Sequence, residues 1–234
     1  MTSTSPLNGA ARTLARPRLV RRMGVALRDG PVLLIAPAGY GKSHLLRALL
    51  LQQPHAQHVQ LSIEDSDVAQ LQARLTPVLM EGATLLLDDI HHLHGATEAL
   101  AWLNAQRASP SHHFVLSGRM SPDAYWPKRF AVFAADELAF SSAEANTLLV
   151  GLNGLTPDMI AQWHARTRGW PLLLSLLARQ VDATGFKTVI SAFISKNLSG
   201  LNTEDQRVLR SAPREIDSTD LLLRREVRAN PLHR

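Results

Sequence analysis

The segment 36–43, with the sequence APAGYGKS, constrains the fold of this chain more than any other feature. It follows the apolar run 31–36 (PVLLIA), which is typical of a strand buried on both faces, and it precedes a segment with helical spacing, 43–51. Gly39 and Gly41 permit backbone conformations that residues with a Cβ rarely adopt. Such a turn directs successive N–H groups, and the positive end of the following helix, toward one point. The pattern predicts a phosphate-binding loop in an α/β fold.

The residue types in this loop match the chemistry of a bound triphosphate. The Lys42 ammonium is expected to neutralise the β- and γ-phosphates, and the Ser43 hydroxyl is expected to ligate Mg²⁺. Ala36 stands where the usual motif has its first glycine. ATP or ADP with Mg²⁺ is therefore the expected cofactor. The residues expected to contact the nucleotide here are Ala36, Pro37, Ala38, Gly39, Tyr40, Gly41, Lys42, Ser43 and His44.

Two acidic residues follow a second apolar run, 84–87, and the first of them lies 46 residues after Lys42. Ligands of open α/β sheets bind at the carboxyl ends of the strands, where these acids would lie. Asp88 is the expected Mg²⁺ ligand, through water, together with Ser43. Asp89 is expected to orient or deprotonate an attacking water.

A third strand-like segment, 113–117 (HFVLS), is followed by a glycine and an arginine. Ser117 is expected to hydrogen-bond the γ-phosphate, and Arg119 is expected to pair with it. The catalytic candidates are therefore Asp89, Lys42 and Arg119. Three histidines follow the acids, and we interpret them as loop residues because the chain has no cysteine and the adjacent acids already suit Mg²⁺: His91, His92 and His94.

Strand-like and helical segments alternate up to about residue 140, which predicts a parallel sheet with helices on both faces. Further strands are expected at 58–62, at 84–88 and at an edge formed by 131–134 or 137–140, and further helices at 18–27, 65–79 and 97–108. From residue 141 the pattern is all helical, with a capping box at Ser141 and a second helix start at Thr156. The expected domains are a flexible leader (1–15), a P-loop domain (16–140), a helical subdomain (141–212, with helices at 172–181, 186–197 and 203–211) and a tail (213–234).

The net charge of +5 is concentrated at the start of the chain. Residues 1–30 contain six arginines and one acid, whereas the remaining 204 residues contain 19 basic and 19 acidic side chains. Such an arm either contacts phosphates or is a solvated, solubilising segment. No apolar run reaches the roughly 18 residues that span a bilayer, so no membrane partner and a cytoplasmic location are expected.

Several motifs in order resemble those of one family: APAGYGKS, LLLDDIHHL, the Ser/Arg strand, ELAFSSAEANTLL and the turn Arg168-Gly169-Trp170-Pro171. Over residues 14–200 the chain resembles the N-terminal ATPase of the MalT-like large LuxR-type transcriptional regulators, within the STAND group of P-loop NTPases. The resemblance implies an ATP/ADP switch with slow hydrolysis. It also implies that Arg16 and Pro17 flank the base, that Pro171 lies near the adenine or sugar, and that Arg119 senses the γ-phosphate.

The resemblance implies self-association, or association with a full-length regulator, in the ATP state. Full family members continue into helical repeats and a DNA-binding domain, for which this chain has no room, so direct DNA binding is not expected. Two alternatives stay open. The motifs GKSHLL and DDIHHL also resemble AAA+ replication initiators and helicase loaders, with Arg129 as one candidate arginine finger. The chain could also be a non-catalytic nucleotide-binding interaction protein.

Overall fold

The computed structural model describes residues 14–53, 55–79, 83–109, 112–119, 130–150 and 155–178. These residues divide into two compact units. The sheet unit comprises residues 16–138, and the helical unit comprises residues 14–15 and 139–178 within the described ranges. The leader before residue 14, the helices expected at 186–197 and 203–211, Arg129 and the tail lie outside the described residues.

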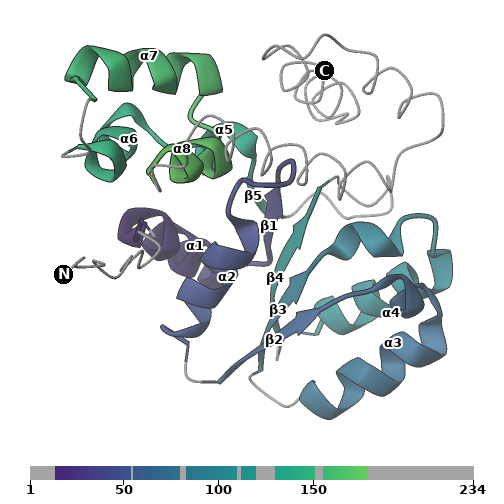
Figure 1. The fold of residues 1–234 in the computed structure, drawn as a ribbon. Coiled ribbons are helices and arrows are strands. Elements are labelled where there is room, and N and C mark those ends of the chain that lie inside the picture. Colours follow the sequence, from purple (N-terminus) through teal and green to yellow (C-terminus); the bar gives the residue numbers. More distant parts are fainter. Residues whose placement is uncertain are drawn as a thin grey trace, which may run out of the picture. The chain divides into compact units, whose positions relative to one another are not determined.

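The sheet unit contains a five-stranded, fully parallel sheet in the order β2-β3-β4-β1-β5 (Figure 1). The strands are β1 (Val32–Ile35), β2 (Ala56–Gln60), β3 (Thr84–Asp88), β4 (His113–Gly118) and β5 (Ala131–Phe133). Every residue of β1 and β3 is buried, as their continuous apolar runs predict for central strands. The predicted parallel α/β fold is therefore confirmed.

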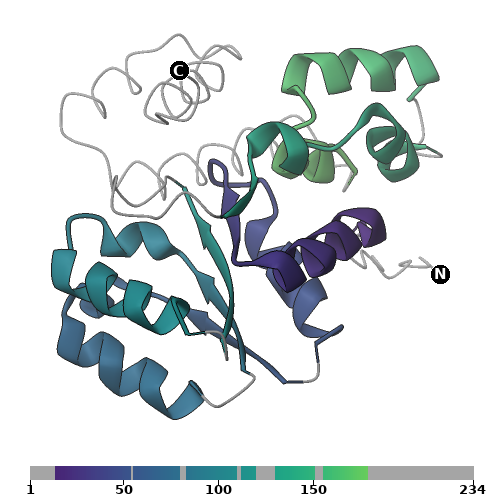
Figure 2. The same cartoon turned by 180° about the vertical axis from the view of Figure 1, so that it is seen from behind.

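Helices cover both faces of this sheet (Figures 1 and 2). On one face lie α1 (Pro17–Asp29) and α2 (Lys42–Leu50), and on the other lie α3 (Val68–Leu75) and α4 (Thr97–Arg107). Alternate strand residues separate the two sides, so the core beneath α3 and α4 is built from Leu33, Ile35, Leu71, Leu75, Leu85, Leu87, Leu100, Leu103, Phe114 and Leu116. The sheet unit ends with the short helix α5 (Ala135–Leu138).

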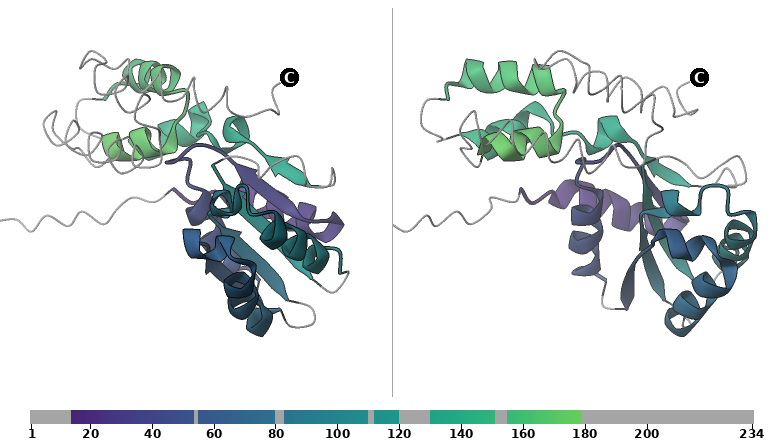
Figure 3. Two further views of the ribbon diagram at one scale, coloured as in Figure 1. Left: turned by 90° about the vertical axis from the view of Figure 1, so that its right-hand side faces the viewer. Right: turned by 45° about the vertical axis from the view of Figure 1, so that its right-hand side comes forward.

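The helical unit contains α6 (Ser142–Leu149), α7 (Pro157–Thr167) and α8 (Pro171–Ala178), drawn in green in Figure 3. Both predicted helix starts are confirmed: Ser141 and Glu144 form a reciprocal capping box, and the Thr156 hydroxyl accepts a hydrogen bond from the Met159 amide. The three helices enclose a small apolar core, against which Leu14 also packs: Phe140, Ala145, Leu148, Leu149, Ile160, Leu174 and Ala178.

Several predicted boundaries differ from the structure. The second strand is Ala56–Gln60 rather than 58–62, and the edge strand is Ala131–Phe133, because 135–138 is helical. The helix expected over 65–79 is divided into the 3-10 turn η1 (Ile63–Ser66), α3, and the turn η2 (Thr76–Val78). Local capping explains the division, because Asp67 accepts hydrogen bonds from two amides of the first turn of α3. Pro77 follows the end of α3, as predicted.

The turn between α7 and α8 holds the helical unit together by a close backbone approach. Gly169 has φ +71° and Arg168 has φ +49°, so two successive residues are left-handed. The Phe140 amide donates to the Gly169 carbonyl at 2.8 Å, and the His164 Nε2 lies 2.7 Å from the Phe140 carbonyl oxygen. A Cβ at Gly169 would lie 2.3 Å from that same oxygen. Glycine is therefore required at 169 for both its conformation and its size.

A series of glycine-to-alanine variants tests this requirement. Gly169→Ala is expected to lower the free energy of unfolding by about 3 kcal/mol or more, because strain and a steric clash add. Gly95→Ala shares the positive φ (+79°) but has open space, and is expected to lose only about 1 kcal/mol. Gly24→Ala, in open space within α1, is expected to gain about 0.5 to 1 kcal/mol. Urea denaturation measures all three, and equal losses for Gly169→Ala and Gly95→Ala would contradict the steric argument.

Candidate functional site

The segment 36–41 connects β1 to α2 with the backbone geometry of an anion-binding loop. Gly39 has φ +84° and Gly41 has φ +78°, which residues with a Cβ rarely adopt. Gly41 is the N-cap of α2, and its carbonyl accepts from the Leu45 amide at 3.0 Å. Ala36 is 1% exposed and its amide donates to the Gly118 carbonyl, which extends the β1–β4 pairing into the loop. The positive end of the α2 dipole therefore points into this loop.

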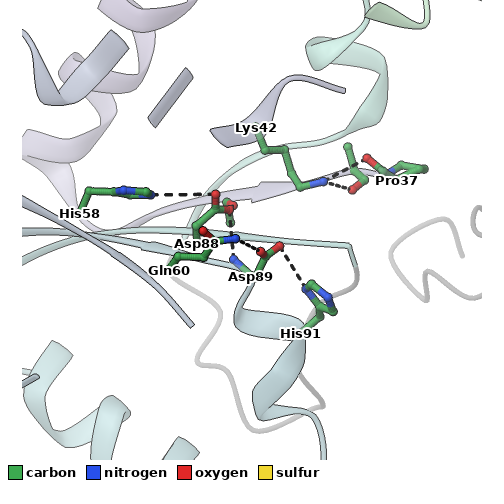
Figure 4. Close-up of polar contacts among 9 residues, drawn as sticks. Pro37, Lys42, His58, Gln60, Asp88, Asp89 and His91 are labelled. Atoms are coloured by element: carbon green, nitrogen blue, oxygen red, sulfur yellow. Dashed lines mark hydrogen bonds and ion pairs between the residues drawn. The ribbon is translucent and has the colours of Figure 1, made fainter. Parts of the chain in front are cut away.

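The Lys42 side chain folds back into the loop that precedes it. Its ammonium donates to the Ala36 carbonyl at 2.5 Å and to the Pro37 carbonyl at 3.0 Å (Figure 4). Lys42 is only 7% exposed, so these carbonyls solvate a buried charge. Ser43 follows it in a half-buried position, and His44 is exposed. A phosphate group is a stronger acceptor than a carbonyl, and the ammonium is already at the loop that would hold it.

Asp88 ends β3 as a buried carboxylate, 1% exposed. Its Oδ1 accepts from the Ser117 hydroxyl on the neighbouring strand β4, and from the Asp89 amide at 3.0 Å. Its Oδ2 lies 4.0 Å from the Nε2 of His58 on the other neighbouring strand, β2. Ser117 was expected to contact the γ-phosphate, and the structure places its hydroxyl on Asp88, so here it positions the expected magnesium ligand.

Asp89 follows in the left-handed region, with φ +62°. Aspartate tolerates this conformation better than most residues, and such outliers concentrate at functional sites. The Gln60 side-chain amide donates to Asp89 Oδ2 at 3.0 Å, and His91 Nδ1 lies 3.7 Å from Oδ1 (Figure 4). The carboxylate is therefore flanked on both oxygens.

His58 and Gln60 also face the two acids, and the sequence motifs did not predict either of them. Both lie on β2, and Gln60 pairs in register with Asp88. The segment AQHVQ alternates polar and apolar residues around Val59, and this pattern could have indicated them. Val59 is partly buried and packs on the apolar core, whereas His58 and Gln60, on either side of it, reach the acids. His58 and Gln60 lie beside Asp88 and Asp89 because β2 is the neighbour of β3 in the sheet, and this strand order was not predicted.

His91 lies close to this cluster on the 3-10 turn η3 (Ile90–Leu93). Burial lowers the pKa of His91 from 6.5 to about 4, and the positive charges of His92, Arg119 and Lys42 act in the same direction while Asp89 opposes them. Its ring stacks on His92 at 4.4 Å between centroids. Within the described part of the chain, its buried Nδ1 has no hydrogen-bond partner. His91 is therefore neutral at pH 7.

This lowered pKa predicts a pH dependence of stability. The unfolded chain binds the His91 proton more readily than the folded chain between pH 6.5 and about 4, so the free energy of unfolding falls as the pH is lowered through this window. A His91→Gln variant is expected to lose less stability than the parent between these two values, as measured by urea denaturation. An NMR titration of His91 with a midpoint near 6.5 would contradict the prediction.

The other candidate residues divide between the two units. Arg119 is exposed directly after β4, on the same sheet edge as Asp88. Arg16 is the N-cap of α1, where its guanidinium donates to the Leu138 carbonyl at 2.7 Å, and Pro17 is the first residue of that helix. Pro171 is buried at the start of α8 in the helical unit. The sheet unit thus brings the loop, both acids and Arg119 to one edge, whereas Pro171 belongs to the other unit.

The donor set suits Mg²⁺ and a polyphosphate. The Ser43 hydroxyl and the Asp88 carboxylate are hard oxygen ligands, which Mg²⁺ prefers. The buried ammonium of Lys42 and the left-handed glycines supply positive charge and a concave backbone for phosphate oxygens. The residues present therefore fit a magnesium–nucleotide complex.

Solved structures of other proteins share this fold, and two of them illustrate the likeness. A Walker-type ATPase of Pyrococcus abyssi is 15% identical, with a TM-score of 0.59 over 88% of this chain and 81% of that chain. The replication initiator DnaA, bound to AMPPCP and single-stranded DNA, is 12% identical, with a TM-score of 0.52 over 79% of this chain and 67% of that chain. At these identities the likeness shows the fold alone, a parallel sheet flanked by helices.

No protein-family model matches the sequence, and a comparison with curated proteins found no match. Among the described helices, none is both long and apolar enough to cross a membrane.

Proposed function

We propose that this chain is an ATP/ADP-binding switch module with slow, Mg²⁺-dependent ATP hydrolysis, of the kind found in MalT-like signal-transduction regulators. The observation that carries the proposal is the buried Lys42 ammonium, held inside a left-handed glycine loop at the sheet edge that also carries Asp88. A cation in this place, at the positive end of a helix, is suited to the β- and γ-phosphates.

The roles of the residues follow from their chemistry. Ser43 and Asp88 would hold Mg²⁺, which neutralises phosphate charge when bound, and Ser117 orients Asp88 through its hydrogen bond. Asp89 would orient the attacking water, and Arg119 would sense the γ-phosphate. By the resemblance to the MalT-like regulators alone, Arg16 and Pro17 would flank the base, and Pro171 would lie near the adenine or the sugar.

The surroundings of Asp89 support slow turnover. Gln60 donates a hydrogen bond to Asp89 Oδ2, so one of the acceptor sites of this carboxylate is already in use. Aspartate is also shorter than glutamate by one methylene, which leaves more distance between the carboxylate and a γ-phosphate. A switch that resets slowly suits a regulator better than a motor.

The bound nucleotide tests the proposal directly. We expect native mass spectrometry of the purified protein to show ADP, and isothermal titration with Mg²⁺ to show binding of both ATP and ADP. Turnover is expected to be well below the median enzyme value of about 10 per second. If neither ATP nor ADP binds at a concentration of about 1 mM, the binding free energy is weaker than about −4 kcal/mol, and the proposal is overturned.

The same preparation separates the alternatives. A switch module is expected to self-associate with a non-hydrolysable ATP analogue and not with ADP, which sedimentation velocity measures. A replication-type helper ATPase would instead show turnover that DNA stimulates strongly. A purely non-catalytic partner would bind nucleotide without measurable hydrolysis.

A further inference from the structure

The helix α1 carries its apolar and its basic residues on opposite sides. Its buried residues are Leu19, Val20, Met23 and Leu27. Since successive residues of an α-helix lie about 100° apart, these four form one stripe, and the opposite side presents Arg18, Arg21, Arg22, Val25 and Arg28, all exposed. The helix expected at 18–27 is present as α1, and the structure adds that its arginines share one exposed side.

Two arginines at this end of the chain attach α1 to its own unit. Arg22 pairs with Glu137 of α5 at 2.5 Å and lies 5.3 Å from the centre of the Phe133 ring. Arg16 donates to the Leu138 carbonyl. These contacts and the buried stripe hold α1 in place on the sheet unit. A partner that binds its outer side therefore loses less conformational entropy on binding.

The remaining three arginines, Arg18, Arg21 and Arg28, project from the outer side without an ion pair or hydrogen bond to any described residue. Asp29 is the only acid in the helix. Because residues 31–234 carry equal numbers of basic and acidic side chains, the excess positive charge of the whole chain lies in and just before α1. The outer side of α1 is therefore a concentrated source of positive potential.

We propose that the outer side of α1, through Arg18, Arg21 and Arg28, binds the phosphodiester backbone of a double-stranded nucleic acid. Arg18 and Arg28 are ten residues apart, about 15 Å along the helix, which faces about four phosphates of one DNA strand. All the basic residues of α1 are arginines, whose planar guanidinium groups bind phosphate oxygens in pairs. The proposal does not depend on the nucleotide-binding role of the loop at 36–43.

The same observations disfavour other anionic partners. A helix that binds a lipid surface inserts its apolar side, but here that side is buried in the sheet unit and Val25 is the one large apolar residue exposed on α1. Single-stranded nucleic acids are held by stacked aromatic side chains, and α1 contains none. Contacts to the backbone alone also predict binding without sequence preference.

The test compares two double variants with the same change in charge. Arg18→Gln/Arg21→Gln removes two outer arginines of α1, and Arg47→Gln/Arg166→Gln removes two exposed arginines elsewhere. Each lowers the formal net charge from +5 to +3. Fluorescence anisotropy of the full chain is measured with a random-sequence DNA duplex of about 25 base pairs, with an RNA duplex, and with vesicles containing phosphatidylglycerol, from about 50 to 200 mM salt.

For three phosphate contacts, the parent is expected to lose about 40-fold in DNA affinity across this salt range, and the α1 variant only about 3-fold. At the lowest salt the α1 variant is expected to bind at least about tenfold more weakly than the Arg47/Arg166 variant. The DNA and RNA arms identify which duplex is preferred. Equal losses in the two variants, preference for the vesicles, or no duplex binding by the parent would each overturn the proposal. Isothermal titration with ATP, unchanged in both variants, shows that the loop at 36–43 is intact.

Discussion

Replacement of Lys42 by alanine is expected to weaken the binding of both ATP and ADP by at least about 100-fold. The ammonium is buried, so that its hydrogen bonds to phosphate oxygens would form in a region of low dielectric constant. Each charge-assisted hydrogen bond contributes about 1.5 to 3 kcal/mol, and the loss of two corresponds to about 3 kcal/mol or more. The variant also leaves the Ala36 and Pro37 carbonyls without the hydrogen bonds that they accept from Lys42 in the parent.

Isothermal titration with Mg²⁺ and each nucleotide measures this loss. Arg47→Ala is the matched control, because Arg47 is an exposed cation on the same helix. Lys42→Arg keeps the charge but changes its shape, and is expected to recover only part of the affinity. Circular dichroism establishes that each variant is folded. If Lys42→Ala binds nucleotide as tightly as the parent, the proposed site is wrong.

Replacement of Asp89 by asparagine is expected to reduce ATP hydrolysis by about 10²- to 10⁴-fold, with ATP affinity changed by no more than about twofold. The carboxylate lies at the carboxyl end of β3, beside Asp88 but separate from its buried oxygens. The side-chain oxygen of asparagine can still accept the hydrogen bond from Gln60. Asparagine also tolerates the left-handed backbone at position 89. The change therefore removes the basic carboxylate while the loop at 36–43 stays intact.

Single-turnover release of phosphate measures the rate, and titration with a non-hydrolysable ATP analogue measures the affinity. Asp158→Asn in the helical unit is a matched control, since Asp158 is exposed in the first turn of α7. A collapse of nucleotide binding in Asp89→Asn would show that Asp89 binds rather than catalyses. An unchanged rate would exclude it as the residue that orients water.

The local parts of the site could be predicted because their signals are contiguous. The apolar run before Ala36, the two glycines and Lys42 specify a strand, a left-handed turn and a helix within 20 residues. The capping residues Ser141 and Thr156 predicted helix starts for the same reason, since a cap contacts amides only two or three residues away. The boundaries within 63–79 were less accurate, because Asp65 completes the capping box of η1 while Asp67, two residues later, caps the separate helix α3.

Residue spacing alone could not predict the partners of the two acids. Ser117 reaches Asp88 across 29 positions, and Gln60 reaches Asp89 across the same separation, because β2, β3 and β4 are neighbours in the sheet. The left-handed backbone of Asp89 could not be predicted either, because aspartate adopts this conformation in only a minority of cases. It follows from the place of Asp89 at the end of β3.

The amino-acid sequence by itself determined the fold class, the glycine-containing loop between β1 and α2, and the two acids at the end of β3, because each depends on residues close together in the chain. Only the tertiary structure decided which side chains flank Asp88 and Asp89, and that the arginines of α1 share one exposed side. Those features depend on strand order and on which side of a helix is buried. Both are set by the packing of distant apolar residues, which minimises the apolar surface exposed to water across the whole unit.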